Sequence, residues 1–201
     1  MTDQNEEHRI AMEKRQAEQR EIIKSKKKGT RGQLLVNTGD GKGKSTAGFG
    51  TVLRALGCDW KVAIVLFVKG KWKTGEREFF NRFSDLVDLR VMGEGFTWDT
   101  QDREQDIRAA RAAWEVSCEM MQSGKYQLVL LDELNIVLRS GYLPLEEVLA
   151  GLAARHVDTH VIVTGRNAPT ELMDMADMVT EMKKIKHPFD VGIKATQGID
   201  Y

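Results

Sequence analysis

The stretch Leu34-Leu35-Val36-Asn37-Thr38-Gly39-Asp40-Gly41-Lys42-Gly43-Lys44-Ser45-Thr46 joins a short apolar run to the start of an amphipathic segment. Glycines let the backbone turn so that successive N–H groups point inward, and a helix start adds partial positive charge. Lys44 supplies a full positive charge, and Ser45 offers a hydroxyl to a metal ion. This strand–loop–helix order predicts a phosphate-binding loop (P-loop) for a nucleoside triphosphate, with Mg²⁺ or Mn²⁺ as the metal.

The loop is a variant of the GxxxxGK[ST] pattern. Thr38 stands where the first glycine belongs, and Gly39 comes one residue late. Lys42 is an additional cation within the loop, and it either contacts a phosphate or remains solvated. The residues predicted to bind ATP are Thr38, Gly39, Asp40, Gly41, Lys42, Gly43, Lys44, Ser45 and Thr46.

Downstream of this loop, short apolar runs alternate with amphipathic stretches, as in βα units stacked into a parallel sheet. Strands are expected at 33–37, 62–68, 88–92, 127–132, 160–164 and 178–182. Helices are expected at 44–56, 75–83, 103–122, 134–139, 145–154 and 169–175. The first of these helices is expected to stop at Gly57 in a left-handed conformation. The predicted fold is α/β and P-loop NTPase-like (RecA-like), with a mostly parallel six-stranded sheet flanked by helices.

Bulk composition excludes several classes of protein. The 201 residues suit one α/β domain, and 30 basic residues balance 30 acidic ones, which disfavours a nucleic-acid partner. Cys58 and Cys118 show neither disulfide nor zinc spacing, which favours a reducing cytoplasm. The charged N-terminus and the short apolar runs predict neither secretion nor membrane insertion.

Residues 1–32 differ from the remainder because they are charged, Gln-rich and poor in large apolar side chains. Such a segment cannot build a core of its own. It is either a solvated, partly helical arm or a segment that docks on the body or on a partner subunit. We therefore divide the chain into an arm at 1–32 and a P-loop domain at 33–201.

Two acidic residues follow the apolar run of one predicted strand. Asp132 and Glu133 come directly after Leu128-Val129-Leu130-Leu131. P-loop proteins place a carboxylate beside the bound metal in this way, at the carboxyl edge of the sheet. Ser45, Asp132 and Glu133 are therefore the predicted metal-binding residues, although either acid could instead cap the next helix. Glu133 in this place is also compatible with activation of water for hydrolysis.

Further candidate residues follow other strands. Arg166 comes after the strand at 160–164, where a guanidinium suits either a phosphate or a structural ion pair. The basic stretch 69–77 is either a polyanion contact or a solvated rim. Phe96 and Trp98 are separated by one residue and flanked by glycines, so they pack either in the core or against a large planar ligand.

Together these residues resemble the bacterial corrinoid adenosyltransferases, ATP:cob(I)alamin adenosyltransferases with a P-loop fold. The resemblance runs from about residue 33 to the end. Its P-loop is widespread, whereas the Phe-Thr-Trp-Asp segment and the Gly-Ile-Asp-Tyr terminus are specific. The matching stretches include Thr38 to Thr46, Gly95-Phe96-Thr97-Trp98-Asp99-Thr100, Leu130-Leu131-Asp132-Glu133-Leu134, Thr164-Gly165-Arg166 and Gly198-Ile199-Asp200-Tyr201.

The resemblance implies that a Co(I) corrinoid (cobalamin, cobinamide or a related compound) attacks the 5′ carbon of ATP and that inorganic triphosphate leaves. ATP then lies in the loop in reversed polarity, and Lys44, Glu133 and Arg166 are the catalytic candidates. Phe96 and Trp98 would bind the corrin ring and displace the lower axial ligand of Co(II). The resemblance further implies a reduced flavoprotein as electron donor and a homodimer, with the N-terminal arm over the partner's active site.

Two other functions are compatible with the P-loop. One is an ATP hydrolase or a RecA-like nucleic-acid motor with Glu133 as its base, against which the zero net charge speaks. The other is a nucleotide-dependent corrinoid carrier without catalysis. The products formed from ATP and a reduced corrinoid distinguish all three.

Overall fold

The computed structural model describes residues 2–26, 29, 31–68, 74–92 and 102–200. It divides the chain into two compact units, Met1–Thr30 and Arg31–Tyr201. The described part of the first unit contains one helix, α1 (Thr2–Ser25), whose residues 4–25 are all exposed.

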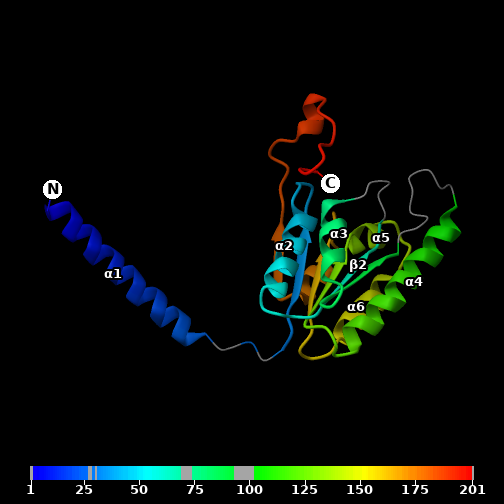
Figure 1. The fold of residues 1–201 in the computed structure, drawn as a ribbon, viewed down its shortest axis with the longest axis horizontal. Helices are drawn as coiled ribbons and strands as arrows, with labels where there is room; N and C mark the ends of the chain where they lie inside the picture. Colours follow the sequence, from blue (N-terminus) through cyan, green and yellow to red (C-terminus); the bar gives the residue numbers. More distant parts are fainter. Residues whose placement is uncertain (1, 27–28, 30, 69–73, 93–101, 201) are drawn as a thin grey trace. The chain divides into compact units, whose positions relative to one another are not determined.

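The second unit is an α/β domain built on one six-stranded sheet (Figure 1). Its strands are β1 (Leu34–Thr38), β2 (Val62–Leu66), β3 (Val87–Val91), β4 (Leu128–Asp132), β5 (His160–Thr164) and β6 (Met178–Glu181). Its helices are α2 (Lys44–Leu56), α3 (Gly75–Phe80), η1 (Asn81–Phe83), α4 (Arg103–Gln122), α5 (Leu134–Arg139), α6 (Leu145–Ala153), α7 (Thr170–Met175) and η2 (Pro188–Val191).

The strands run in the order β3-β2-β4-β5-β1-β6, and every pairing is parallel. The predicted α/β fold with a six-stranded sheet is thereby confirmed. Parallel strands point their carboxyl ends toward one edge, and ligands of open α/β sheets bind there. The segments after β1, β4 and β5 therefore meet at a single edge of the sheet.

Both faces of the sheet are covered, which explains why its central strands read as continuous apolar runs. In β4, Val129 and Leu131 pack in the core under α4, α5 and α6, while Leu128 and Leu130 pack in the core under α2. Among the described residues, Trp114 of α4 is the largest fully buried side chain. The sheet is thus a rigid base for the loops at its carboxyl edge.

The left-handed stop expected at Gly57 is wrong. Gly57 has φ −65° and stays in the right-handed region, whereas Asp59 has φ 56°. The turn closes two residues late, where the Trp60 N–H donates to the Ala55 carbonyl at 3.1 Å. An aspartate tolerates the left-handed conformation because its short polar side chain can hydrogen-bond locally.

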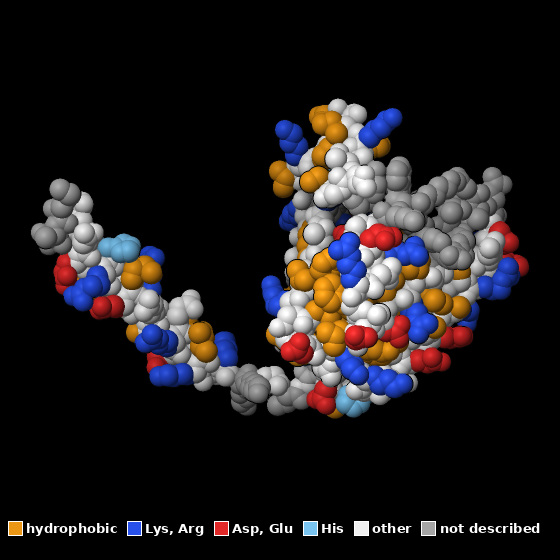
Figure 2. Space-filling model, in the orientation of Figure 1, with side chains coloured by type: hydrophobic (Ala, Val, Ile, Leu, Met, Phe, Trp, Pro, Cys, Tyr) orange, Lys and Arg blue, Asp and Glu red, His pale blue; other side chains and the backbone are white. Residues whose placement is uncertain are grey.

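The C-terminal segment leaves the edge strand β6 and returns to the carboxyl edge of the sheet (Figure 1). Its apolar side chains are largely exposed, and Figure 2 shows them interspersed with basic ones. These exposed residues include Ile185, Phe189, Val191, Ile193 and Ile199. Among the described residues, no helix has the length and apolar character that crossing a bilayer requires.

Candidate active site

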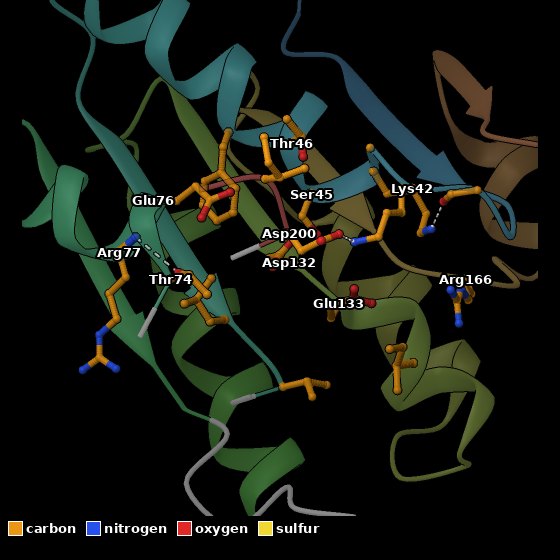
Figure 3. A pocket seen from close by; sticks show the side chains of 18 of the residues that line it. Lys42, Ser45, Thr46, Thr74, Glu76, Arg77, Asp132, Glu133, Arg166 and Asp200 are labelled. Atoms are coloured by element: carbon orange, nitrogen blue, oxygen red, sulfur yellow. Dashed lines mark hydrogen bonds and ion pairs between the residues drawn. The ribbon is translucent and has the colours of Figure 1, made fainter. Parts of the chain in front are cut away.

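A cavity of about 430 Å³ lies at the carboxyl edge of the sheet. The P-loop forms one side, and the ends of β2, β3, β4 and β5 form the others. Figure 3 shows Ser45, Asp132, Glu133 and Arg166 around this cavity, with the Arg77 side chain directed away from it. An apolar part of the wall consists of Phe49, Leu66, Val68, Val91, Ile136 and Ile199.

The P-loop is held in shape by the segment after β6. The Gly41 N–H donates to the Met182 carbonyl at 2.6 Å, and the Met182 N–H donates to the Thr38 carbonyl at 2.8 Å. Gly39 has φ 97°, and a Cβ there would lie 2.5 Å from the Met182 carbonyl oxygen. A glycine is required at this position because both the backbone angle and the space exclude a side chain.

Six of the nine predicted ATP-binding residues line the cavity: Gly41, Lys42, Gly43, Lys44, Ser45 and Thr46. Thr38, Gly39 and Asp40 are not part of its lining. The Thr38 hydroxyl instead accepts a hydrogen bond from the Ala168 N–H at 3.0 Å. The variant first half of the loop therefore has a structural role, tying the loop to the segments after β5 and β6.

Lys44 is a buried cation in the P-loop, with 7% of the residue exposed. Its ammonium group donates to the Gly41 carbonyl at 2.5 Å. Burial, and then the neighbouring Arg166, lower the pKa of Lys44. A buried positive charge of this kind favours an anionic ligand, because an anion would offset the cost of desolvation.

Lys42 forms an ion pair with Asp200, near the C-terminus (Figure 3). Its side chain is half exposed, and the hydrogen bond from Lys42 lowers the pKa of Asp200. Asp200 and Ile199 also line the cavity. No role in the site was predicted for these two residues. The only signal for them was the family-specific Gly-Ile-Asp-Tyr terminus.

Asp132 ends β4 and connects two parts of the site. Its carboxylate accepts a hydrogen bond from the Thr164 hydroxyl at 2.7 Å and lies near the Ser45 side chain. Burial raises the pKa of Asp132. A cation beside this carboxylate would offset the cost of its burial. Ser45 and Asp132, predicted to share a metal ion, thus line the same cavity.

Glu133 occupies a strained turn between β4 and α5. Its φ is 64°, although it is not a glycine, and its side chain makes no capping hydrogen bond to α5. The Oε2 atom is buried without a hydrogen-bond partner within the described residues. Burial, and then the neighbouring Asp132, raise the pKa of Glu133 to about 7. Backbone strain and an unsatisfied buried oxygen are typical of functional sites.

These residues fit a hard cation. Mg²⁺ prefers oxygen ligands and is held by one or two carboxylates together with phosphate and water oxygens. Ser45, Asp132 and the unpaired oxygen of Glu133 supply oxygen donors at one side of the cavity. In the described part of the chain, no cluster of three His, Cys, Asp or Glu residues could hold a metal by itself. The site therefore suits a cation that shares its ligands with a bound phosphate.

Arg166 lies one residue beyond Thr164-Gly165 and is exposed at the rim of the cavity. Its charge lowers the pKa of both Lys44 and Glu133, which places it within electrostatic reach of the two. Among the described residues, no salt bridge occupies its guanidinium. Phe96, Trp98 and the basic residues 69–73 lie outside the described residues.

The fold and the cavity together define a P-loop NTPase-like α/β protein. The flagellar accessory protein FlaH of Methanocaldococcus jannaschii shares this fold, with a TM-score of 0.53 and 12% sequence identity over 75% of this chain and 71% of that one. At this identity the likeness concerns the fold alone.

Residues 30–201 match the family described as ATP:corrinoid adenosyltransferase BtuR/CobO/CobP, and the chain belongs to this family. The corrinoid adenosyltransferase of Pseudomonas aeruginosa is 49% identical over 199 residues, which are 99% of this chain and 98% of the relative. The corrinoid adenosyltransferases of Escherichia coli K12 and Salmonella typhimurium (CobA) are each 46% identical over 171 residues, 85% of this chain and 86% of each relative. The family resemblance inferred from the motifs is confirmed.

The raised pKa of Glu133 predicts a pH-dependent stability. The Glu133 carboxyl group binds its proton more tightly in the folded protein than in the unfolded chain. The free energy of unfolding therefore decreases as pH rises from 4.5 to about 7 and stays reduced above that. We expect Glu133→Gln to stabilise the metal-free protein by about 1–3 kcal/mol at pH 8, and by less at pH 5. Urea unfolding at both pH values measures this difference.

The matched control is Glu146→Gln, on the exposed side of α6. We expect this variant to track the wild-type protein at both pH values. An equal gain from Glu133→Gln at pH 5 and pH 8 would contradict the assignment of a buried, proton-binding carboxyl group to Glu133.

Proposed function

We propose that the protein transfers the 5′-deoxyadenosyl group of ATP to the Co(I) ion of a corrinoid and releases inorganic triphosphate. The observation that carries this proposal is the family match over residues 30–201, in a chain whose own cavity joins a P-loop to the half-buried acids Asp132 and Glu133. In the reaction, a lone pair of Co(I) attacks C5′. The C5′–O bond breaks with its electrons going to the triphosphate, so the cobalt becomes formally Co(III).

Charge develops on the triphosphate as it leaves, and the P-loop supplies the groups that stabilise it. Lys44 is buried beside the loop amides, and Arg166 faces the same cavity. Donors already aligned toward developing charge lower the barrier without further reorganisation. With ATP in reversed polarity, the loop holds the departing group while C5′ faces the corrinoid. When the triphosphate binds, the Lys42 ammonium group would leave Asp200 and contact a phosphate oxygen.

Ser45, Asp132 and Glu133 are proposed to hold Mg²⁺, with Mn²⁺ as a substitute. When bound, the ion neutralises negative charge on the triphosphate. The buried oxygen of Glu133 and the carboxylate of Asp132 gain a positive partner in this state, which supports the assignment. A bound cation favours the ionised form of Glu133, and burial raises the pKa of this group to about 7 in the metal-free protein, so Mg²⁺ is expected to bind more tightly as the pH rises toward 7.

The corrinoid is proposed to bind against Phe96 and Trp98, which displace the lower axial ligand of Co(II). Loss of that ligand removes electron donation and makes the ion easier to reduce. We expect Phe96→Ala and Trp98→Ala to lower the rate about tenfold or more when Co(II) is supplied with a flavoprotein reductant, as is usual for residues that tune a metal.

Chemically generated cob(I)alamin should restore most of the activity of these two variants. The measurement is the rate of adenosylcobalamin formation from Co(II) and from Co(I), compared for each variant and the wild-type protein. Equal loss with both forms of cobalamin would assign the rings to packing instead of axial-ligand displacement.

A reduced flavoprotein as electron donor, a homodimer and a cytoplasmic location belong to the same proposal. They rest on the family resemblance and on the cysteine content. We also propose that residues 1–32 act as an arm that docks on the partner subunit, separate from the P-loop domain at 33–201. Helix α1 supports this, because Ile10, Met12, Ile22 and Ile23 are 40–66% exposed on it. An isolated helix of this kind gains stability by packing against another surface.

The deciding experiment incubates the full chain anaerobically with MgATP and chemically reduced cobalamin, and analyses both products. Formation of light-sensitive adenosylcobalamin and triphosphate in equal amounts is the expected result. ADP and phosphate without a carbon–cobalt bond would identify a hydrolase, and tight corrinoid binding without turnover would identify a carrier. Either result would overturn the proposal.

A further inference from the structure

Thr164 is the last residue of β5, and its hydroxyl makes two hydrogen bonds to the acid pair. The Oγ1 atom donates to Asp132 Oδ1 at 2.7 Å and accepts from the Glu133 N–H at 2.9 Å. Thr164 is fully buried and does not line the cavity. Any effect of Thr164 on a ligand must therefore act through Asp132 and Glu133.

The strand register brings this hydroxyl to the acids. β4 and β5 are paired with Leu131 opposite Val163, so the next residue of each strand lies at the same level of the sheet. Beyond this point Glu133 takes a φ of 64°, a conformation that is unfavourable for a residue with a Cβ. The bond from the Glu133 N–H to Thr164 satisfies a buried donor in this strained turn.

The neighbouring residues leave little freedom in the turn. The Asn135 side-chain amide donates to the Gly165 carbonyl at 3.0 Å, which ties α5 to the end of β5. A Cβ at Gly165 would lie 2.9 Å from the Asn135 Cβ and 3.1 Å from Glu133 Oε2. The ends of β4 and β5 are thus in close contact, and the Thr164 hydroxyl is the polar link between the two acids.

We propose that Thr164 is a positioning residue for the metal–nucleotide complex. Its hydroxyl orients the Asp132 carboxylate toward Ser45 and holds the turn that presents Glu133 to the cavity. Only a small side chain that both donates and accepts can replace it at this buried position. This inference rests on one part of the proposed function, namely that Asp132 and Glu133 hold Mg²⁺ together with ATP.

The hydroxyl and the methyl group of Thr164 can be tested separately. The methyl carbon would lie 3.3 Å from a Cβ built at Gly48 of α2, so it takes part in packing between the sheet and α2. Thr164→Val keeps the methyl packing and removes both hydrogen bonds. Thr164→Ser keeps both hydrogen bonds and removes the methyl group. A role in packing and a role in positioning therefore predict opposite orders of effect.

The experiment measures ATP affinity by calorimetry for the full chain, in excess Mg²⁺ and in EDTA, without a corrinoid. Mg²⁺ increases the affinity for ATP by a certain factor. We expect this factor to be about tenfold or more smaller in Thr164→Val than in the wild-type protein, as is usual when the residue orienting a metal ligand is replaced. Affinity in EDTA should change little. Thr164→Ser should stay close to wild type in both conditions.

Thr159→Val is the matched control. Thr159 is also buried, and its hydroxyl donates to the Tyr126 carbonyl at 2.9 Å, just before the opposite end of β5. This variant should keep the full Mg²⁺ effect. If Thr164→Val does not fold, Thr164→Ser and Thr164→Ala form the comparison, because both lack the methyl group and differ only in the hydroxyl.

The proposal would be overturned if Mg²⁺ increased the ATP affinity of Thr164→Val as much as that of the wild-type protein. It would also be overturned if the valine and serine variants lost this increase equally. The test does not depend on the products of the enzyme. An ATP hydrolase would give the same binding result, so failure of the proposed adenosyl transfer and failure of the positioning role are distinguishable.

Discussion

Replacement of Lys44 by alanine is expected to lower kcat/KM for ATP by about two to three orders of magnitude, the usual effect of losing one preorganised donor. The physical reason is that Lys44 is the buried cation of the P-loop, while Arg166 lies at the exposed rim. Burial and the neighbouring Arg166 lower the pKa of Lys44, so an anion beside its ammonium group would interact with it strongly.

The measurement for Lys44 is steady-state adenosylcobalamin formation with chemically reduced cobalamin, over a range of ATP concentrations. Lys44→Met serves as a second variant, because it keeps the apolar stem and removes only the charge. Lys42→Ala compares the more exposed cation of the same loop. Lys42 is half exposed and already paired with Asp200, so its loss should have a much smaller effect. Near-normal turnover in Lys44→Met would contradict the phosphate role.

Asp132→Asn is expected to raise the Mg²⁺ concentration needed for half-maximal activity about tenfold or more and to lower kcat/KM by about 100-fold. The amide keeps the size of the carboxylate and an oxygen that can accept the Thr164 hydrogen bond. It removes the negative charge that a cation requires. Because burial raises the pKa of Asp132, loss of this charge should not destabilise the metal-free fold.

Titration of activity with Mg²⁺, together with thermal unfolding of the metal-free protein, tests this prediction. Asp88→Asn is the control, since Asp88 lies early in β3 and accepts hydrogen bonds from Arg90 and Tyr126 outside the cavity. An unchanged Mg²⁺ requirement in Asp132→Asn would reassign the metal to other ligands. A large fall in melting temperature would indicate a structural role instead.

The elements that could be predicted from the sequence are those with local signals. Helices α2 and α4 begin and end at the expected residues. The start of α4 is capped by the Asp102 side chain, which accepts from the Glu104 and Gln105 N–H groups. The prediction of one helix at 75–83 was less accurate, because this segment divides into α3 and the 3₁₀ helix η1. Phe80, the last residue of α3, packs in the core on the α2 side of the sheet.

Within the site, the residue types were predictable and their partners were not. The P-loop motif identified Lys44 and Ser45. The apolar run 128–131 identified the two acids that follow it, Asp132 and Glu133. Nothing in the linear pattern indicated that Asp200 pairs with Lys42 or that Thr38 binds the segment after β5. Capping of the next helix was the alternative interpretation of Glu133, and the structure gives its side chain no capping hydrogen bond.

The sequence by itself determined the α/β alternation, the P-loop and the family, because each depends on residues close together along the chain. Tertiary structure alone decided the strained turn at Glu133, its unpaired oxygen and the hydroxyl of Thr164 between the two acids. The reason is the parallel sheet: it brings the ends of β4 and β5 together although their hydrogen-bonded residues are 31 and 32 positions apart. Burial at that edge then sets the charges and the pKa values of the site.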